Sequence, residues 1–131
     1  MSPASVDETT LAGSESMLAF GDAAAFEGWL EANHAAASAI WLKIAKKGAP
    51  QMTLSYGDAV EVALSFGWID GQKDRLDQHY WLQRFTPRSA RSRWSKINRQ
   101  KAERLMSEGR MRPAGLAAVE QARADGRWDS G

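Results

Sequence analysis

The sequence contains no cysteine, and this absence excludes several kinds of site at once. None of its 131 residues can form a disulfide, hold zinc as a thiolate or attack a substrate as a Cys nucleophile. The two histidines, His34 and His79, have no metal-ligand spacing to each other or to a suitable carboxylate. We therefore predict no metal site and no cofactor.

Catalytic motifs and membrane segments are also missing. Spacing reveals no Ser-His-Asp arrangement, no glycine-rich phosphate loop and no glycosidase-type pair of carboxylates. No apolar run approaches the length of a membrane span, and the first residues lack the basic and apolar regions of a signal peptide. We predict no catalytic residue, no membrane insertion and a cytoplasmic location, and the sequence leaves the oligomeric state open.

Positive charge is absent from the first part of the chain. No Lys or Arg precedes Lys43, whereas ten basic residues lie from Arg84 to Arg112 against two glutamates, although the whole chain carries a net charge of only +1. This segregation has two interpretations. The second half binds an anionic partner, or its charges are solvated and compensated by the acidic first half.

The composition that remains is typical of one folded domain. Hydrophobic residues make up 44% and charged residues 25% of the chain, and the six Trp, four Phe and two Tyr supply large side chains for a core. We expect residues 1–15, which are small, polar and acidic, to be a flexible tail. Residues 16–131 then form a single domain.

Four stretches have the character of strands. Residues 17–20 predict an edge strand, and residues 40–45 alternate as a half-buried strand does. A third strand begins at Trp68, and residues 79–85 form a fourth that Pro87 ends.

Four helices are predicted from their starts and stops. Asp22, Ser55, Ser92 or Ser95, and Pro113 are suitable first residues. We expect Trp94 and Ile97 on the inward face of the third helix, and Leu116 and Val119 on that of the fourth. The prediction is an α+β fold: a small, mainly antiparallel sheet with about four helices packed on it.

The segment "RFTPR" is the first candidate for a site. A guanidinium matches carboxylate or phosphate in a bidentate way, and Pro87 stiffens the loop that carries Arg84, Thr86 and Arg88. These residues can form an anion clamp, with the start of the next helix adding backbone N–H groups. In the alternative interpretation, Arg84 pairs with an aspartate of the neighbouring strand and Arg88 lies in water.

The segments "GWIDGQ" and "WSKIN" supply aromatic and polar neighbours. Trp68 and Asp70 share one side of a strand, Gly71 permits close backbone approach, and Trp94 and Asn98 are spaced for one helical face. The alternative buries both tryptophans in the core with Asp70 in a salt bridge. The candidate ligand-binding residues are Trp68, Asp70, Gly71, Arg84, Thr86, Arg88, Trp94 and Asn98.

These motifs resemble the YdeI/OmpD-associated family, whose members are also called bacteriocin-protection proteins. The similar runs are "AFEGWLEANHAAASAIWLKIAKKG", "LSYGDAVEVALSFGWIDGQ", "RFTPRSARSRWSKIN" and "MRPAGLAAVEQARADGRW". The resemblance implies a bacterial protein linked to antimicrobial-peptide resistance and to a porin, with no catalytic mechanism or cofactor. The motif residues that it carries over are Trp68, Asp70, Gly71, Arg84, Thr86, Pro87, Arg88, Trp94, Ser95 and Asn98.

Together these observations predict a non-catalytic domain, associated with bacterial stress and antimicrobial resistance, that binds a small anionic ligand in a pocket lined by Arg and Trp. The first alternative is a nucleic-acid-binding protein that uses the basic stretch 91–112. The second is a hydrolase-like or lyase-like enzyme with Asp70 as base and an arginine stabilising an oxyanion.

Overall fold

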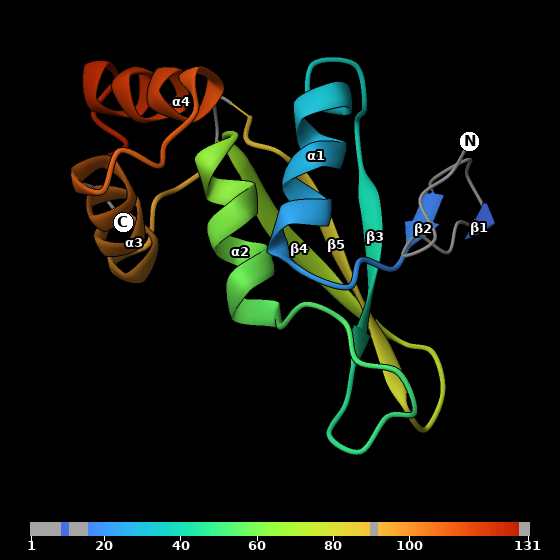
Figure 1. The fold of residues 1–131 in the computed structure, drawn as a ribbon. Helices are drawn as coiled ribbons and strands as arrows, with labels where there is room; N and C mark the ends of the chain where they lie inside the picture. The colour runs from blue at the N-terminus through green and yellow to red at the C-terminus, as the bar shows by residue number, and fades with distance from the viewer. Residues whose placement is uncertain (1–8, 11–15, 90–91, 129–131) are drawn as a thin grey trace.

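A computed structural model describes residues 9–10, 16–89 and 92–128. They form one five-stranded sheet and four helices, and two of the helices, α1 and α2, lie against the same face of the sheet (Figure 1). The α+β prediction is confirmed. No helix in the described part of the chain is both long and apolar enough to cross a membrane.

The sheet has the strand order β1-β2-β3-β5-β4. Its strands are β1 (Thr9–Thr10), β2 (Ser16–Leu18), β3 (Ile40–Ala45), β4 (Trp68–Arg75) and β5 (Tyr80–Pro87). Only β2 and β3 pair in parallel, so the sheet is mainly antiparallel, as predicted.

The edge-strand prediction for residues 17–20 is wrong, because β2 lies between β1 and β3. Its partner β1 comes from the predicted tail, where an acidic composition gives no strand signal. The rest of that tail, residues 1–8 and 11–15, lies outside the described residues.

The helices begin where the sequence indicates. They are α1 (Ala23–Asn33), α2 (Tyr56–Ser65), α3 (Lys96–Ser107) and α4 (Pro113–Ala124). Side-chain oxygens of the residues before α1, α2 and α3 each accept a hydrogen bond from a backbone N–H three residues on, which satisfies a donor left over at the helix start. These caps are Asp22, Ser55 and Ser95.

The cap of α3 changes one prediction. Because Ser95 is the cap, Trp94 precedes the helix and does not share a helical face with Asn98. Ile97 was expected on the inward face but is 64% exposed, and the buried positions of α3 are Ala102 and Leu105. Ile97 lies in the first turn, where the start of the helix projects away from the neighbouring elements, so the prediction for Ile97 was wrong while Ala102 and Leu105 are buried.

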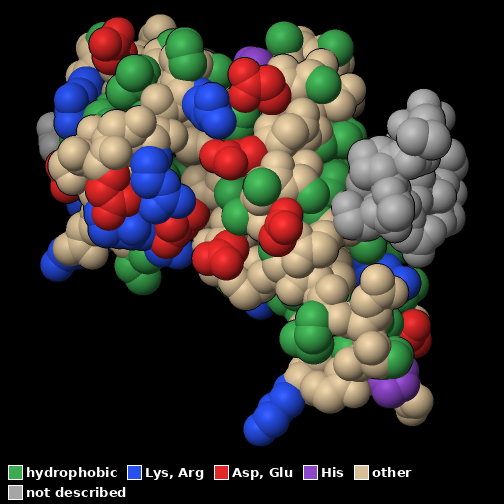
Figure 2. Space-filling view, viewed as in Figure 1, with side chains coloured by type: hydrophobic (Ala, Val, Ile, Leu, Met, Phe, Trp, Pro, Cys, Tyr) green, Lys and Arg blue, Asp and Glu red, His purple; other side chains and the backbone are tan. Residues whose placement is uncertain are grey.

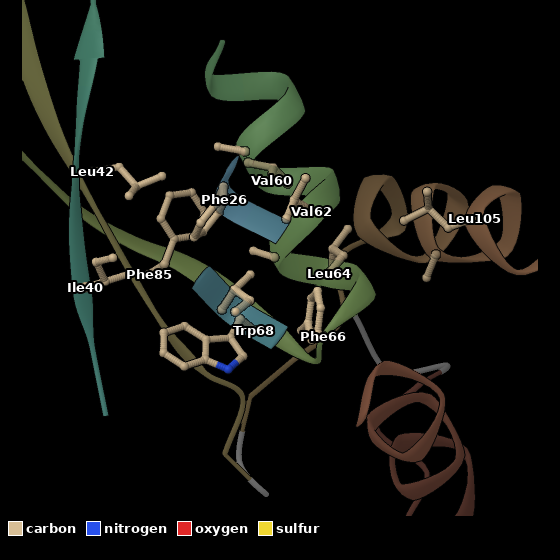
Figure 3. Packing of buried hydrophobic residues seen from close by; sticks show 14 of the residues in the cluster. Phe26, Ile40, Leu42, Val60, Val62, Leu64, Phe66, Trp68, Phe85 and Leu105 are labelled. Carbon is tan, nitrogen blue, oxygen red and sulfur yellow. The ribbon is translucent and has the colours of Figure 1, made fainter. Parts of the chain in front are cut away.

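The core lies between the sheet and the helices (Figure 3). Ile40, Leu42 and Phe85 point from the sheet toward Phe26 of α1 and the apolar side of α2, and all four of these named side chains are fully buried. The helices α3 and α4 contact α2, so they extend the core beyond the end of the sheet (Figure 1). This second layer places the loop after β5 beside the C-terminal segment.

The strand β4 is irregular between Asp70 and Lys73, and a buried side chain holds this irregularity. Gln83 of β5 is fully buried, and its Nε2 donates to the carbonyl oxygens of Gly71 at 3.0 Å and Gln72 at 3.2 Å. The side-chain amide thus replaces the ladder bonds that a bulge removes. It fixes the strand segment that follows Asp70.

Candidate anion-binding site

Arg88 follows directly after β5 and is held from three sides. Its backbone N–H donates to the carbonyl oxygen of Gly67 at 2.9 Å. Its guanidinium carbon lies 3.7 Å from the centroid of the Trp94 ring, a close cation–π contact, and its Nη1 donates to the carbonyl oxygen of Arg93 at 3.1 Å. The side chain therefore has a fixed position.

Three buried donors at this position have no hydrogen-bond partner in the described structure. They are Nε and Nη2 of Arg88 and Nε1 of Trp94. Nε and Nη2 form one edge of the guanidinium plane, the edge that binds an oxyanion with two parallel hydrogen bonds. Each donor buried without a partner costs about 1–3 kcal/mol, so three together are a strong indication of a binding site.

Burial and neighbouring charges shape the electrostatics of Arg88. Burial, opposed by the negative charge of Asp70 and assisted by the positive charge of Arg127, lowers the pKa of Arg88 to about 10. Arg88 is therefore still a cation at neutral pH. The burial of that cation is unfavourable, and a bound anion would relieve the cost.

A pocket of about 300 Å³ adjoins this arginine. None of the residues that line it is acidic: they are Arg88, Ser89, Trp94, Ala118, Gln121 and Arg127. They come from the loop after β5, from α4 and from the segment after α4. Because Arg88 Nε and Nη2 are covered by neighbouring atoms, an anion that reaches them must first displace a neighbouring side chain.

The C-terminal segment closes this site from the other side. The rings of Trp94 and Trp128 lie 4.9 Å apart, and the guanidinium of Arg123 lies 4.8 Å from the Trp128 ring. Arg99 Nη1 donates to the carbonyl oxygens of Trp94 and Trp128 at 3.2 and 2.8 Å. The Trp94 and Trp128 rings therefore contact each other with Arg88 over the first and Arg123 over the second, and this cluster joins the loop to the C-terminal segment.

Sequence reasoning missed the contribution of this segment. Arg127 Nη1 donates to the carbonyl oxygen of Ser92 at 2.7 Å, and Arg127 Nε pairs with Asp125 at 3.0 Å. The only available signal was the short run "GRW" near the end of the chain, with arginine beside tryptophan. Such a run carries no information about its spatial partners, which lie some 35 residues earlier.

The structure separates several residues that the sequence grouped together. Trp68 is 1% exposed and packs edge-on against Trp29, with ring centroids 6.0 Å apart, so it belongs to the core (Figure 3). In the register of β4 and β5, Asp70 is opposite Phe85 and Ile69 is opposite Thr86. Side chains alternate along a strand, so Thr86 and Arg84 point to the sheet face away from Asp70 and Trp68.

Asp70 forms a hydrogen bond with a tyrosine. Its Oδ2 accepts a hydrogen bond from the Tyr56 hydroxyl at 2.6 Å. Burial, this hydrogen bond and the negative charge of Asp70 together raise the pKa of Tyr56 to about 12. Asp70 therefore acts on Arg88 through its charge, and no hydrogen bond between the two side chains is seen among the described contacts.

The two remaining candidates have backbone roles in this structure. The carbonyl oxygen of Gly71 accepts from Gln83 in the bulge, and the backbone N–H of Asn98 donates to the Ser95 cap. Neither residue lines the pocket beside Arg88. Of the eight candidates the structure thus joins Arg88 and Trp94 in one pocket, and the ligand-binding role of every candidate stays a prediction.

Part of the basic stretch is paired with glutamates of the first half. Figure 2 shows acidic side chains over α2 and the adjoining part of α1, beside Lys and Arg side chains of α3. Three arginines of the stretch form ion pairs with glutamates of α1 and α2: Arg104 and Arg110 with Glu61, and Arg112 with Glu27 and Glu31. Charge compensation, one of the two interpretations of the segregated charge, accounts for these arginines.

A second hollow of about 460 Å³ lies where α1 meets the turn between α3 and α4. Arg110 and Arg112 line it together with Glu27. Both arginines already pair with glutamates, so this hollow offers an anion weaker attraction than the pocket beside Arg88.

Comparison with known proteins gives a family and no function. The family model described as a domain of unknown function, DUF8412, matches residues 18–118, from β2 into α4. No curated protein and no solved structure matches the chain. The matched segment includes Arg88 and Trp94 and ends before Gln121 and Arg127. Because the match covers more than half of its length, the chain belongs to the DUF8412 family.

Proposed function

We propose that this domain is a non-catalytic binding module for a small anionic ligand, which it binds in the pocket beside Arg88. The observation that supports this function is the set of three buried donors without partners on Arg88 and Trp94. A binding protein keeps such donors because the ligand, and not the protein, supplies their acceptors.

The side chain of Arg88 is already ordered before a ligand binds. The stack on Trp94 and the hydrogen bond from Nη1 already hold the guanidinium in place. A side chain fixed before the ligand arrives loses little conformational freedom on binding, so more of the interaction free energy appears as affinity.

The biological setting is part of the same proposal. The resemblance of "GWIDGQ", "RFTPR" and "WSKIN" to the YdeI/OmpD-associated family suggests a role in bacterial stress or resistance to antimicrobial peptides. A cytoplasmic binding module for a small anion fits such a role without any contact with a porin.

A thermal-shift screen with nucleotides, phosphates and polyanionic metabolites tests the function. A ligand present at one hundred times its Kd is expected to stabilise the fold by about 2.7 kcal/mol. Arg88→Lys should abolish the shift, because an ammonium lacks the planar fork.

The matched control is Arg84→Lys. It changes an arginine of the same segment that points to the sheet face away from the core, and it should leave the shift intact. If Arg84→Lys lost the shift and Arg88→Lys kept it, the ligand would bind beside Arg84 and not beside Arg88. No shift with any anion in the panel would remove the proposed function.

Nucleic-acid binding by residues 91–112 ranks below this proposal. The four basic residues of α3 are Lys96, Arg99, Lys101 and Arg104, and at about 100° per residue they are spread around the helix and not aligned in one stripe. The enzyme alternative also ranks lower, because the Asp70 carboxylate is engaged by the Tyr56 hydroxyl.

A further inference from the structure

The three donors without partners lie in two layers. Arg88 Nε and Nη2 belong to a guanidinium whose carbon is 3.7 Å from the centroid of the Trp94 ring, and Nε1 belongs to that ring. A carboxylate has two oxygens in one plane, which match one guanidinium edge. A phosphoryl group has three terminal oxygens in a tetrahedral arrangement, so it can accept from the guanidinium and from the indole at the same time.

The local charge also favours an anion with more than one negative charge. Arg88 and Arg127 both line the pocket, and the charge of each acts on the other, as the lowered pKa of Arg88 indicates. Asp125 pairs with Arg127 and offsets part of its charge, and Asp70 accepts from Tyr56. No carboxylate is seen to hydrogen-bond the buried Nε and Nη2 of Arg88 within the described residues.

The volume of the pocket and its remaining lining residues indicate what the ligand carries besides its anionic group. A volume of about 300 Å³ is at the lower end of the range for small-molecule sites. Ala118 offers apolar surface, and Ser89 and Gln121 offer hydrogen bonds, so the pocket has groups for an organic portion as well as for an anion. This favours a small organic phosphate over free phosphate and over a polynucleotide.

We propose that the ligand is a small phosphate monoester whose phosphoryl group binds Arg88 Nε, Arg88 Nη2 and Trp94 Nε1. This inference rests on the proposed function and names its ligand class. The carbon skeleton lies against Ala118, and its hydroxyl groups reach Ser89 and Gln121.

Three probes test the inference by NMR: glycerol 3-phosphate, glycerate, which has a similar carbon skeleton and a carboxylate, and inorganic phosphate, which has no carbon skeleton. The indole N–H signal of Trp94, assigned by its loss in Trp94→Phe, reports on the third donor. Glycerol 3-phosphate should move this signal downfield and bind at least tenfold more tightly than glycerate or inorganic phosphate.

Each of the other results would overturn a specific part of this inference. Equal or tighter binding of glycerate at this site would exclude a phosphate ligand and leave the anion-binding function standing. Equal binding of inorganic phosphate would exclude the monoester. If none of the three probes binds, the phosphate inference fails, and the thermal-shift screen decides separately whether any anion binds.

Two variants keep the test independent of folding. Gln121→Glu places a negative charge on an exposed pocket residue, so the fold should persist while affinity for glycerol 3-phosphate falls at least tenfold. Gln100→Glu adds the same charge to an exposed position of α3 that does not line the pocket, and its affinity should stay within twofold of the unchanged protein. Equal affinities of these two variants would contradict the assigned site.

Discussion

Arg84 and Arg88 flank the same proline, yet they have different environments. Arg84 lies within β5 opposite Trp41 of β3, on the sheet face away from the core. Arg88 lies one residue past the end of β5 and stacks on Trp94. The strand register and the end of the strand decide this difference. The two arginines are therefore not one clamp, and it is Arg88 that lines the pocket beside Trp94.

The position of Arg88 predicts an unusual response to substitution. Replacing a buried charge by an apolar residue of similar size is often neutral or stabilising, because the desolvation cost disappears. We expect Arg88→Met to leave the free energy of unfolding unchanged or to raise it by about 1 kcal/mol, while it abolishes anion binding. Urea denaturation followed by Trp fluorescence measures the first effect.

Arg99→Met is the comparison for this experiment. Arg99 Nη1 makes two hydrogen bonds to backbone carbonyl oxygens, so its removal should cost about 2 kcal/mol. If Arg88→Met lowered the free energy of unfolding as much as Arg99→Met does, Arg88 would be a structural residue. Its proposed role in binding would then be weakened.

At the scale of elements, a close approach of two helices positions the second half of the domain. Gly115 of α4 lies against the backbone of α2, and a Cβ at this position would be 2.3 Å from the carbonyl oxygen of Ser65. The backbone N–H of Arg112 donates to the same oxygen at 2.9 Å. Gly67 also approaches α4 closely, and it has a positive φ of 77°. These glycines allow α4, which carries Ala118 and Gln121, to reach the loop of Arg88.

This contact predicts opposite effects of the same substitution in two helices. Gly115→Ala forces α4 away from Ser65 and should destabilise the domain by about 1–3 kcal/mol. Gly28→Ala in α1 has no atom within 4 Å of the new methyl group and should stabilise by about 0.5–1 kcal/mol, because alanine is the better helix former.

The melting temperatures of the two variants test this prediction. Displacement of α4 should also weaken anion binding in Gly115→Ala, since Ala118 and Gln121 line the pocket. A neutral result for Gly115→Ala would mean that the two helices separate without cost and that their close contact does not position the site.

At the scale of the whole molecule, the two halves of the sequence are held together by opposite charge as well as by the core. Glu61 of α2, whose side chain is 22% exposed, pairs with both Arg104 and Arg110, and Arg112 pairs with glutamates of α1. These arginines make up part of the basic excess. Part of the charge segregation along the sequence is thus compensated in the folded molecule.

Removal of the shared carboxylate should therefore have an effect that depends on salt. Glu61→Gln is expected to lower Tm by a few degrees at low ionic strength, and the difference should shrink in 1 M salt as screening increases. Glu103→Gln is the control, because Glu103 is exposed on α3 and shows no ion pair in the described structure. A Tm difference for Glu61→Gln that is the same at both salt concentrations would contradict an electrostatic cause.

The sequence by itself determined the local structure, because helix caps, strand alternation and strand-ending proline depend on neighbouring residues. Asp22, Ser55 and Pro87 were assigned correctly for this reason. The sequence also singled out Arg88 and Trp94 as chemically suited to an anion. Only the tertiary structure decided that they meet, because their contact and the walls around them depend on strand register and on how α4 docks.

The separation of Arg84 and Thr86 from Arg88, and the arrival of Arg127 and Trp128 beside Trp94, have the same origin. One residue along a strand reverses the face of a side chain, and a partner some 35 residues away leaves no mark on local pattern. The chemistry of the site was therefore readable from residue types. Which of these residues lie together is decided by how the sheet and the second helical layer pack.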